Sequence, residues 1–120
     1  MPRRGDHEFL KDISTAAERI LKYVKNKSFD EFIDDPILQD AVVRNLEVIG
    51  EATKNLSPSL RNKYPEIQWR AISKTRDKIS HQYFGVDYEI VWGIIKNDLI
   101  GLSMRIEAII GDLERLEGTP

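Results

Sequence analysis

The sequence predicts an all-α protein: an antiparallel bundle with a four-helix core, short additional helices and a long C-terminal helix. Nearly every long segment repeats its apolar residues at spacings of three and four, the period of a helix that buries one face. No alternating apolar and polar run of strand length stands out. The chain has 120 residues, 41% of them hydrophobic, and so can bury one core. We expect a single domain over residues 1–120, with a flexible tail at residues 117–120.

The first predicted helix begins with Asp6 as its N-cap and ends near Asn26. Its apolar face consists of Phe9, Leu10, Ile13, Ala16, Ala17, Ile20, Leu21 and Val24. Ser28 and Glu31 then fit a capping box, in which each side chain accepts a hydrogen bond from the backbone N–H of the other residue. This pair predicts a short helical turn through Phe32.

Two further helices start with a cap residue followed by proline, whose missing N–H costs nothing at the first helical position. Asp35-Pro36 begins a long helix that runs to about Leu56, and Ser57-Pro58 begins a brief one. Pro65 ends this connection, because proline disfavours helical geometry in the residue before it.

A third long helix is predicted over about residues 66–83, with Gly85 as its left-handed cap and Asp87 as the N-cap of the next helix. Its apolar stripe contains Trp69, Ile72, Ile79 and Tyr83, and Arg76 falls on the same stripe. His81 lies about 140° round this helix from Arg76 and about 7.5 Å further along the axis. The two side chains do not share one face, but they can converge at the edge of the helix or on a facing helix.

The last segment predicts one helix of about 45 Å if unbroken, because two seven-residue apolar rows run through it. The rows are Trp92, Leu99, Ile106, Leu113 and Ile95, Leu102, Ile109, Leu116. Ile94, Ile100 and Ile110 add apolar residues outside the rows, so a second partner is expected to cover the helix. This pattern favours a homodimer.

Composition excludes several kinds of site. The chain has no cysteine, only two histidines without an HExxH-like pair, and no glycine-rich phosphate loop, so we expect no metal site and no cofactor. It has no apolar run of transmembrane length and no secretory signal at its start, so we expect a cytoplasmic protein without a membrane partner.

Charge is unevenly distributed along the chain. The net charge of −2 argues against a general nucleic-acid coat, which needs a cationic surface. Residues 61–81, however, hold six cations and only two anions. Arg70, Lys74 and Lys78 are placed there to meet phosphates, although lysines on a helix more often form a solvated face.

The stretch from Arg76 to Phe84, RDKISHQYF, has the spacing R(x4)H(x)Y and points to phosphodiester chemistry. Cleavage of RNA without a metal needs a base for the ribose 2′-hydroxyl, an acid for the leaving 5′-oxygen and a cation for the charged phosphate. Histidine, with an ordinary pKa of about 6.5, suits the proton transfers, and the planar arginine fork suits the phosphate. Only His81 is suitably placed in one chain, so a dimer that joins His81 and Arg76 of both copies meets the need.

Each of these residues also has a simpler interpretation. A helical histidine or arginine near an acid is usually a surface or interface group that makes a hydrogen bond, and His81 and Arg76 can be interpreted in this way. Tyr83, from its position alone, is a core or interface aromatic residue. The spacing by itself does not decide between these interpretations and catalysis.

With longer landmarks included, the chain resembles the HEPN superfamily, and within it the DUF86 or HepT-like toxins of MNT–HEPN toxin–antitoxin pairs. The landmarks are IGEATKNLSPSLRNKYPEIQW from Ile49 to Trp69, RDKISHQYFGVDYEIVW from Arg76 to Trp92, and the long final helix. The resemblance implies a dimerising bundle of HEPN type, in which the R(x4)H motifs of two chains form a composite, metal-independent ribonuclease site. It places the catalytic pair on Arg76 and His81.

The resemblance also assigns supporting roles. Asp77 occupies the polar position after the arginine, where many relatives have asparagine, and its carboxylate can orient Arg76. An MNT-type nucleotidyltransferase, the antitoxin of a type VII-like pair, adds AMP to the tyrosine of the motif, which is Tyr83 here. Such a bulky anionic group would occupy the RNA groove and repel phosphates. Glu51, in the GEA segment, is expected to approach Arg76 and anchor it.

The first hypothesis is therefore an RNA-cleaving toxin that a nucleotidyltransferase antitoxin neutralises. The alternative is a non-catalytic helical module that binds a nucleotidyltransferase, a nucleotide or RNA and keeps the motif for structure. In the alternative, Arg76→Ala destabilises the fold or the dimer, and no RNA is turned over.

Overall fold

The computed structural model describes residues 4–81 and 85–117, with the backbone alone for His81 and Glu117. The elements are α1 (Asp6–Tyr23), α2 (Phe29–Ile33), α3 (Pro36–Lys54), α4 (Pro58–Lys63), α5 (Trp69–Ser73), α6 (Thr75–Ile79), β1 (Ser80–His81), β2 (Gly85–Val86), α7 (Tyr88–Ile94), the π-helical turn η1 (Ile95–Leu99) and α8 (Ile100–Glu117). Apart from one pair of two-residue strands, every element of the described residues is helical, so the predicted all-α fold with a long C-terminal helix is confirmed.

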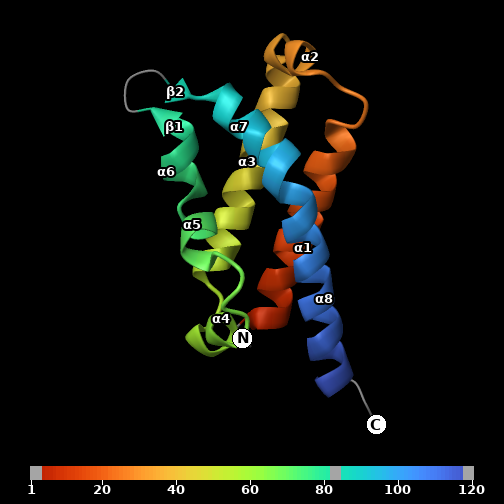
Figure 1. The fold of residues 1–120 in the computed structure, drawn as a ribbon, viewed down its shortest axis with the longest axis vertical. Helices are drawn as coiled ribbons and strands as arrows, with labels where there is room; N and C mark the ends of the chain where they lie inside the picture. The colour runs from red at the N-terminus through yellow and green to blue at the C-terminus, as the bar shows by residue number, and fades with distance from the viewer. Residues whose placement is uncertain (1–3, 82–84, 118–120) are drawn as a thin grey trace.

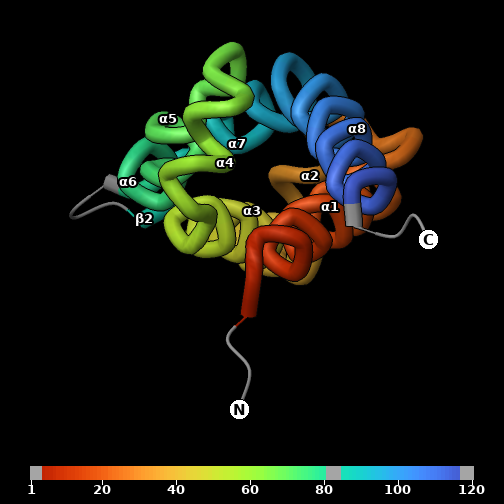
Figure 2. The backbone as a smooth tube through the Cα atoms, turned by 90° about the horizontal axis from the view of Figure 1, so that it is seen from below, coloured from red at the N-terminus to blue at the C-terminus, as the bar shows by residue number. Residues whose placement is uncertain are grey.

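The helices pack side by side around one apolar core. α1 and α3 run antiparallel to each other, and α8 packs against α1 (Figure 1). Seen along the bundle, α5 and α6 lie beside α3 on the side away from α1 (Figure 2). The core contains side chains that are at most 2% exposed, among them Leu10, Ile13, Ile20, Val42, Leu46, Ile49, Val91, Ile95, Leu99 and Ile106.

Most predicted helix starts are confirmed, because capping is an interaction between near neighbours in the chain. The Ser28 N–H donates to Glu31 Oε1 at 3.0 Å and the Glu31 N–H donates to Ser28 Oγ at 3.1 Å, which completes the predicted capping box. The hydrogen bond from the Ser28 backbone is the main cause that lowers the pKa of Glu31 below its ordinary value. Side-chain oxygens of Asp35, Ser57 and Asp87 accept from the first turns of α3, α4 and α7.

The predicted N-cap at Asp6 is wrong, because Gly5 occupies that position and Asp6 is the first residue of α1. The Asp6 carboxylate instead accepts hydrogen bonds from Ser57, from the backbone nitrogen at 2.8 Å and from Oγ at 2.6 Å. Asp6 thus joins the start of α1 to the start of α4. The helix also ends earlier than predicted, at Tyr23, and Asn26 takes a left-handed conformation (φ 62°) in the turn that follows.

The continuous helix predicted over residues 66–83 is wrong. The structure has the two short helices α5 and α6, separated by a turn at Lys74, and α6 is followed by β1. Thr75, the first residue after the turn, donates from Oγ1 to the carbonyl oxygen of Ile72 at 2.6 Å. The helical period alone does not reveal the break.

The end of the predicted helix is a strand pair. β1 and β2 run antiparallel, with Ser80 opposite Val86 and His81 opposite Gly85. Gly85 has the predicted left-handed conformation (φ 77°), but it belongs to this strand pair and does not cap a helix. Tyr83, the predicted last residue of the stripe, lies outside the described residues.

The break in this segment changes which residues face the core. Thr75 and Ile79 of α6 are buried, whereas the Arg76 side chain is 74% exposed. The prediction that Arg76 lies on the apolar stripe is wrong, because α6 starts after the turn with its own register. Trp69 stays in the core as predicted, and its indole N–H donates to the Tyr64 carbonyl at 3.0 Å.

The long C-terminal helix consists of α7, the π-helical turn and α8 in direct succession, and Glu117 is its last residue. The predicted rows are buried at Leu99 and Ile106 of the first and at Ile95 and Ile109 of the second, with exposed fractions of at most 3%. In the second row, however, Leu102 is only partly buried and Leu116 is 70% exposed. Ile100 and Met104 are 57% and 68% exposed, so part of the α8 surface is apolar. No helix within residues 4–81 and 85–117 is long and apolar enough to cross a membrane.

Candidate functional site

Arg76 lies on α6, at a point where this segment approaches α3 closely. Gly50 of α3 allows the approach, since a Cβ atom there would lie 3.4 Å from the Ile72 carbonyl oxygen and 3.7 Å from that of Ser73. A side chain larger than alanine at position 50 would therefore meet the backbone of the α5–α6 turn. The small residue on α3 thus helps to fix where Arg76 stands.

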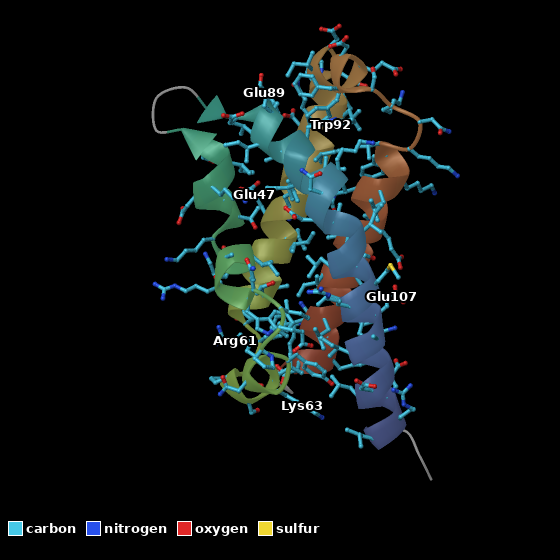
Figure 3. The ribbon with its side chains drawn as sticks, viewed as in Figure 1. Glu47, Arg61, Lys63, Glu89, Trp92 and Glu107 are labelled. Atoms are coloured by element: carbon cyan, nitrogen blue, oxygen red, sulfur yellow. The ribbon has the colours of Figure 1, made fainter. Side chains whose placement is uncertain are left out.

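The carboxylate of Glu47, on α3, is the partner of Arg76. Its Oε2 lies 3.7 Å from Nε of Arg76, between α3 and α6 (Figure 3). The Glu47 side chain is only 34% exposed, so it is the more constrained member of the pair. Because the contact is made at Nε, the two terminal nitrogens of the exposed guanidinium are left to meet an anion.

The structure places Glu47, and not the predicted Glu51, at Arg76. Glu51 pairs with Lys54 at 3.2 Å, and its side chain is 65% exposed. Glu47 and Glu51 are four residues apart and so share one face of α3. The sequence places both carboxylates near the motif but does not say which of them reaches the arginine, and this is why Glu47 was missed.

A groove of about 410 Å³ lies beside Arg76, between the start of α1, the face of α3 and the α5–α6 segment. We call it the Arg76 groove. Its charged lining residues are Arg4, Asp12, Arg44, Glu47, Glu51, Lys54 and Arg76. Several of them form ion pairs across or along the groove, including Arg4 and Asp12, whose Nη1 and Oδ2 are 2.8 Å apart. The groove holds four cations and three carboxylates, so its formal charge is slightly positive.

A second groove, of about 440 Å³, lies on another side of α6, against the long C-terminal helix. We call it the long-helix groove. Its charged lining residues are Lys78, Arg105, Glu66 and Asp98, and most of the others are apolar. The two positive and two negative charges cancel.

The three cations predicted to bind RNA do not gather with Arg76 in one groove. Lys78 is two residues from Arg76 on α6, yet it lines the long-helix groove, whereas Arg76 lines the groove named after it. Arg70 on α5 and Lys74 in the turn are exposed and line neither of the two. Arg76 and Lys78 are two residues apart on α6, about 200° round the helix, and so they face different grooves.

The remaining members of the motif are described only in part. Asp77 is exposed, and among the described residues no hydrogen bond or ion pair joins it to Arg76. The His81 backbone follows α6 directly in β1, but its side chain lies outside the described part of the structure. Tyr83 lies outside it altogether. The convergence of Arg76, His81 and Tyr83 stays a prediction.

The other histidine, His7, is engaged between α1 and α8, where its Nε2 lies 3.0 Å from Oε2 of Glu114. The same seam holds Glu107, whose Oε1 accepts from Ser14 Oγ at 2.8 Å (Figure 3). A hydrogen bond between Glu18 and Glu107 raises the pKa of Glu18 and lowers the pKa of Glu107. Within residues 4–81 and 85–117, no three histidine or carboxylate side chains form a cluster that could hold a metal ion.

Comparisons with known proteins agree on one family. The family model described as "Ribonuclease HepT-like" matches residues 13–109. The Methanocaldococcus jannaschii protein named "Putative RNase MJ0127" is 44% identical over 114 residues, which cover 95% of this chain and 94% of that protein. "Probable ribonuclease HepT" of Thermococcus cleftensis is 38% identical over 107 residues, which cover 89% of this chain and 97% of that protein. No solved structure matches the chain significantly.

Proposed function

Because the chain belongs to the ribonuclease HepT-like family, we propose that it is an endoribonuclease that cuts RNA without a metal ion, at a site formed by two copies of the chain. Membership of the family confirms the resemblance to HepT-like ribonucleases drawn from the sequence. The observation that carries the proposal is the state of Arg76, which is 74% exposed at a groove and contacts Glu47 through Nε. An arginine held in this way presents its terminal N–H groups to a phosphate.

The proposed reaction is an attack by the RNA on its own backbone. One histidine takes the proton of the ribose 2′-hydroxyl, and the 2′-oxygen forms a bond to the adjacent phosphorus. The bond from phosphorus to the 5′-oxygen breaks, and a second, protonated histidine gives its proton to that oxygen. The products are a 2′,3′-cyclic phosphate and a 5′-hydroxyl. Arg76 stabilises the charge that builds up on the phosphate oxygens during the attack.

Two copies of the chain supply the two histidines. His81 of each copy is the candidate, since His7 is paired with Glu114 on the α1–α8 seam. A homodimer that brings both His81 residues and both Arg76 residues to one site provides a base, an acid and two guanidinium groups. Ile100 and Met104 support dimerisation, because they leave apolar surface on α8 that another chain can cover.

Replacing Arg76 by alanine tests the ribonuclease proposal. We expect the rate of RNA cleavage in EDTA to fall by about 10²- to 10³-fold, because the transition state loses its main hydrogen-bond donor to the phosphate. Arg76→Lys should recover part of the rate, since it restores the charge without the planar fork. The rate is measured as the loss of an end-labelled single-stranded RNA under single-turnover conditions.

Arg105→Ala is the matched control, because it removes the same charge from the long-helix groove. We expect this variant to cut at the wild-type rate, and we expect all three variants to keep the wild-type melting temperature. A wild-type protein that leaves RNA intact, with or without EDTA, would support the alternative function, a helical module that binds a nucleotidyltransferase, a nucleotide or RNA without cleaving it.

We also propose that the ribonuclease is the toxin of a type VII-like toxin–antitoxin pair and that Tyr83 is its point of control. In this proposal the Tyr83 hydroxyl attacks the α-phosphorus of ATP on a partner nucleotidyltransferase, pyrophosphate leaves, and AMP remains bound to the tyrosine. The added phosphate lies two residues from His81, where it repels the RNA backbone.

Tyr83→Phe is expected to separate cleavage from control. The variant should still cut RNA, because the phenolic oxygen takes no part in the proposed proton transfers. Incubation with the nucleotidyltransferase and ATP should add the mass of one adenylyl group to the wild-type chain and none to the variant, as measured by intact-protein mass spectrometry. Inhibition of Tyr83→Phe to the same extent as the wild type would rule out this tyrosine as the control point.

A further inference from the structure

We propose that Arg44 is a second phosphate-binding residue and that the Arg76 groove, along the face of α3, holds the RNA strand next to the bond that is cut. The inference rests on the proposed ribonuclease function and deepens it by naming the surface that the substrate follows. Arg44 is not part of the R(x4)H motif, and no spacing rule in the sequence singles it out.

Arg44 lies in the middle of α3, on the face that lines the Arg76 groove. It is exposed and lines the Arg76 groove together with Glu47 and Arg76. α3 and α6 run antiparallel (Figure 1). The N-terminal direction of α3 is therefore the direction in which α6 leads from Arg76 to β1. Arg44 lies one turn back, about 4.5 Å along the axis from Glu47. It is therefore displaced from the Glu47–Arg76 contact toward the strand that carries His81.

Arg44 is also the cation of this groove that is free to bind an anion. The other three cations each have a carboxylate partner: Asp12 for Arg4 at 2.8 Å, Glu51 for Lys54 at 3.2 Å, and Glu47 for Arg76 at 3.7 Å. Within residues 4–81 and 85–117, no carboxylate pairs with Arg44 and no hydrogen bond from its side chain is present. Binding a phosphate at Arg44 thus breaks no ion pair, and its planar fork can donate two parallel hydrogen bonds.

The long-helix groove is a poorer path for RNA. Its two cations are matched by two carboxylates, and Arg76 does not line it. In the Arg76 groove the three carboxylates are all paired, so the unmatched positive charge is that of Arg44. An RNA strand that has one phosphate at Arg76 can therefore make its next contact with a cation at Arg44 on α3.

The salt dependence of RNA binding tests this inference. Each phosphate contact to a single strand contributes about 0.7 to the slope of log K against log salt concentration. In a His81→Ala background, which keeps the RNA intact, adding Arg44→Ala should weaken binding of a single-stranded RNA and reduce the slope by about 0.7 for each Arg44 of the homodimer that contacts the strand. Adding Arg105→Ala, the matched loss of one guanidinium from the long-helix groove, should leave the slope unchanged. Binding is measured by fluorescence anisotropy, and circular dichroism verifies that each variant is folded.

Two outcomes would overturn the role of Arg44. The first is an unchanged affinity and slope in Arg44→Ala. The second is an equal loss in Arg105→Ala, because the arginines would then act through general surface charge. Either result leaves the ribonuclease function in place as long as the wild-type protein cuts RNA and Arg76→Ala cuts it far more slowly. If the wild-type protein does not cleave RNA, the proposed ribonuclease function is wrong, whatever the effect of Arg44→Ala on RNA binding.

Discussion

Replacing His81 by alanine is expected to lower the rate of RNA cleavage by about 10³-fold or more, the largest loss of activity predicted for any single residue of the chain. In the proposed site His81 of one copy is the base and His81 of the other is the acid. One substitution therefore removes both proton transfers from every homodimer. The rate is measured with end-labelled RNA under single-turnover conditions in EDTA, so that neither substrate binding nor a contaminating metal-dependent nuclease determines the result.

His7→Ala is the control for the loss of a histidine. His7 pairs with Glu114 on the seam between α1 and α8 and has no role in the proposed reaction, so the cleavage rate should stay at the wild-type value. The melting temperature and oligomeric state of His81→Ala should also equal those of the wild type. A His81→Ala protein that cuts RNA within a factor of about ten of the wild-type rate contradicts the assignment of His81 as acid and base.

Phe32→Ala is expected to cause the largest loss of stability, about 3–5 kcal/mol in the free energy of unfolding. Phe32 is fully buried, and it is the one buried side chain of the short helix α2. Its ring centroid lies 5.8 Å from that of Tyr88 and 5.2 Å from that of Trp92, both on α7. Removal of the ring leaves a cavity between α2 and α7 that so short a helix cannot close. Urea unfolding, followed by circular dichroism, measures the change.

Ile33→Ala provides the comparison for Phe32→Ala. Ile33 is the next residue of α2, but its side chain is 39% exposed, so its truncation should cost less than about 1 kcal/mol. Equal losses in the two variants would mean that α2 is held by general burial and not by the aromatic cluster. The cluster also bears on the site, because α7 directly follows β2, the strand that pairs with the His81 strand.

The parts of the fold that depend on neighbouring residues are predictable from the sequence. The capping box of Ser28 and Glu31, the caps at Asp35, Ser57 and Asp87, and the central buried face of the long helix all follow from spacing within one or two turns. These interactions form in the same way whatever the rest of the chain does. They are sufficient to predict the all-α class and the starts of α2, α3, α4 and α7.

The errors arise where the sequence pattern does not carry the deciding information. Asp6 is a residue type that favours the N-cap, but its carboxylate accepts hydrogen bonds from Ser57, which is 51 residues away. The apolar spacing from Trp69 to Ile79 suits one helix, yet the structure has two short helices there, separated by a turn at Lys74. The apolar residues repeat with the same helical period of 3.6 residues before and after such a break, so the apolar pattern does not reveal the break.

The same distinction applies to the candidate site. The motif on Arg76 and His81 is visible in the sequence, and together with the longer landmarks it led to the correct family. Glu47 and Arg44 were missed because their roles depend on which side chains already have partners. Glu47 and Glu51 look alike in sequence, and Arg44 is distinguished only when the ion pairs of the other groove cations are known.

The chemistry of the RNA ends is the most direct test of the central claim, that two His81 residues and Arg76 activate the 2′-hydroxyl of RNA without a metal. Wild-type protein is incubated with a 5′-labelled RNA in EDTA, and the termini of the fragments are identified by mass spectrometry. We predict a 2′,3′-cyclic phosphate on each 5′ fragment and a 5′-hydroxyl on each 3′ fragment, and no cut where the 2′-oxygen is methylated. Fragments with 3′-hydroxyl and 5′-phosphate ends would contradict the claim, because water and not the 2′-oxygen would then have attacked the phosphorus.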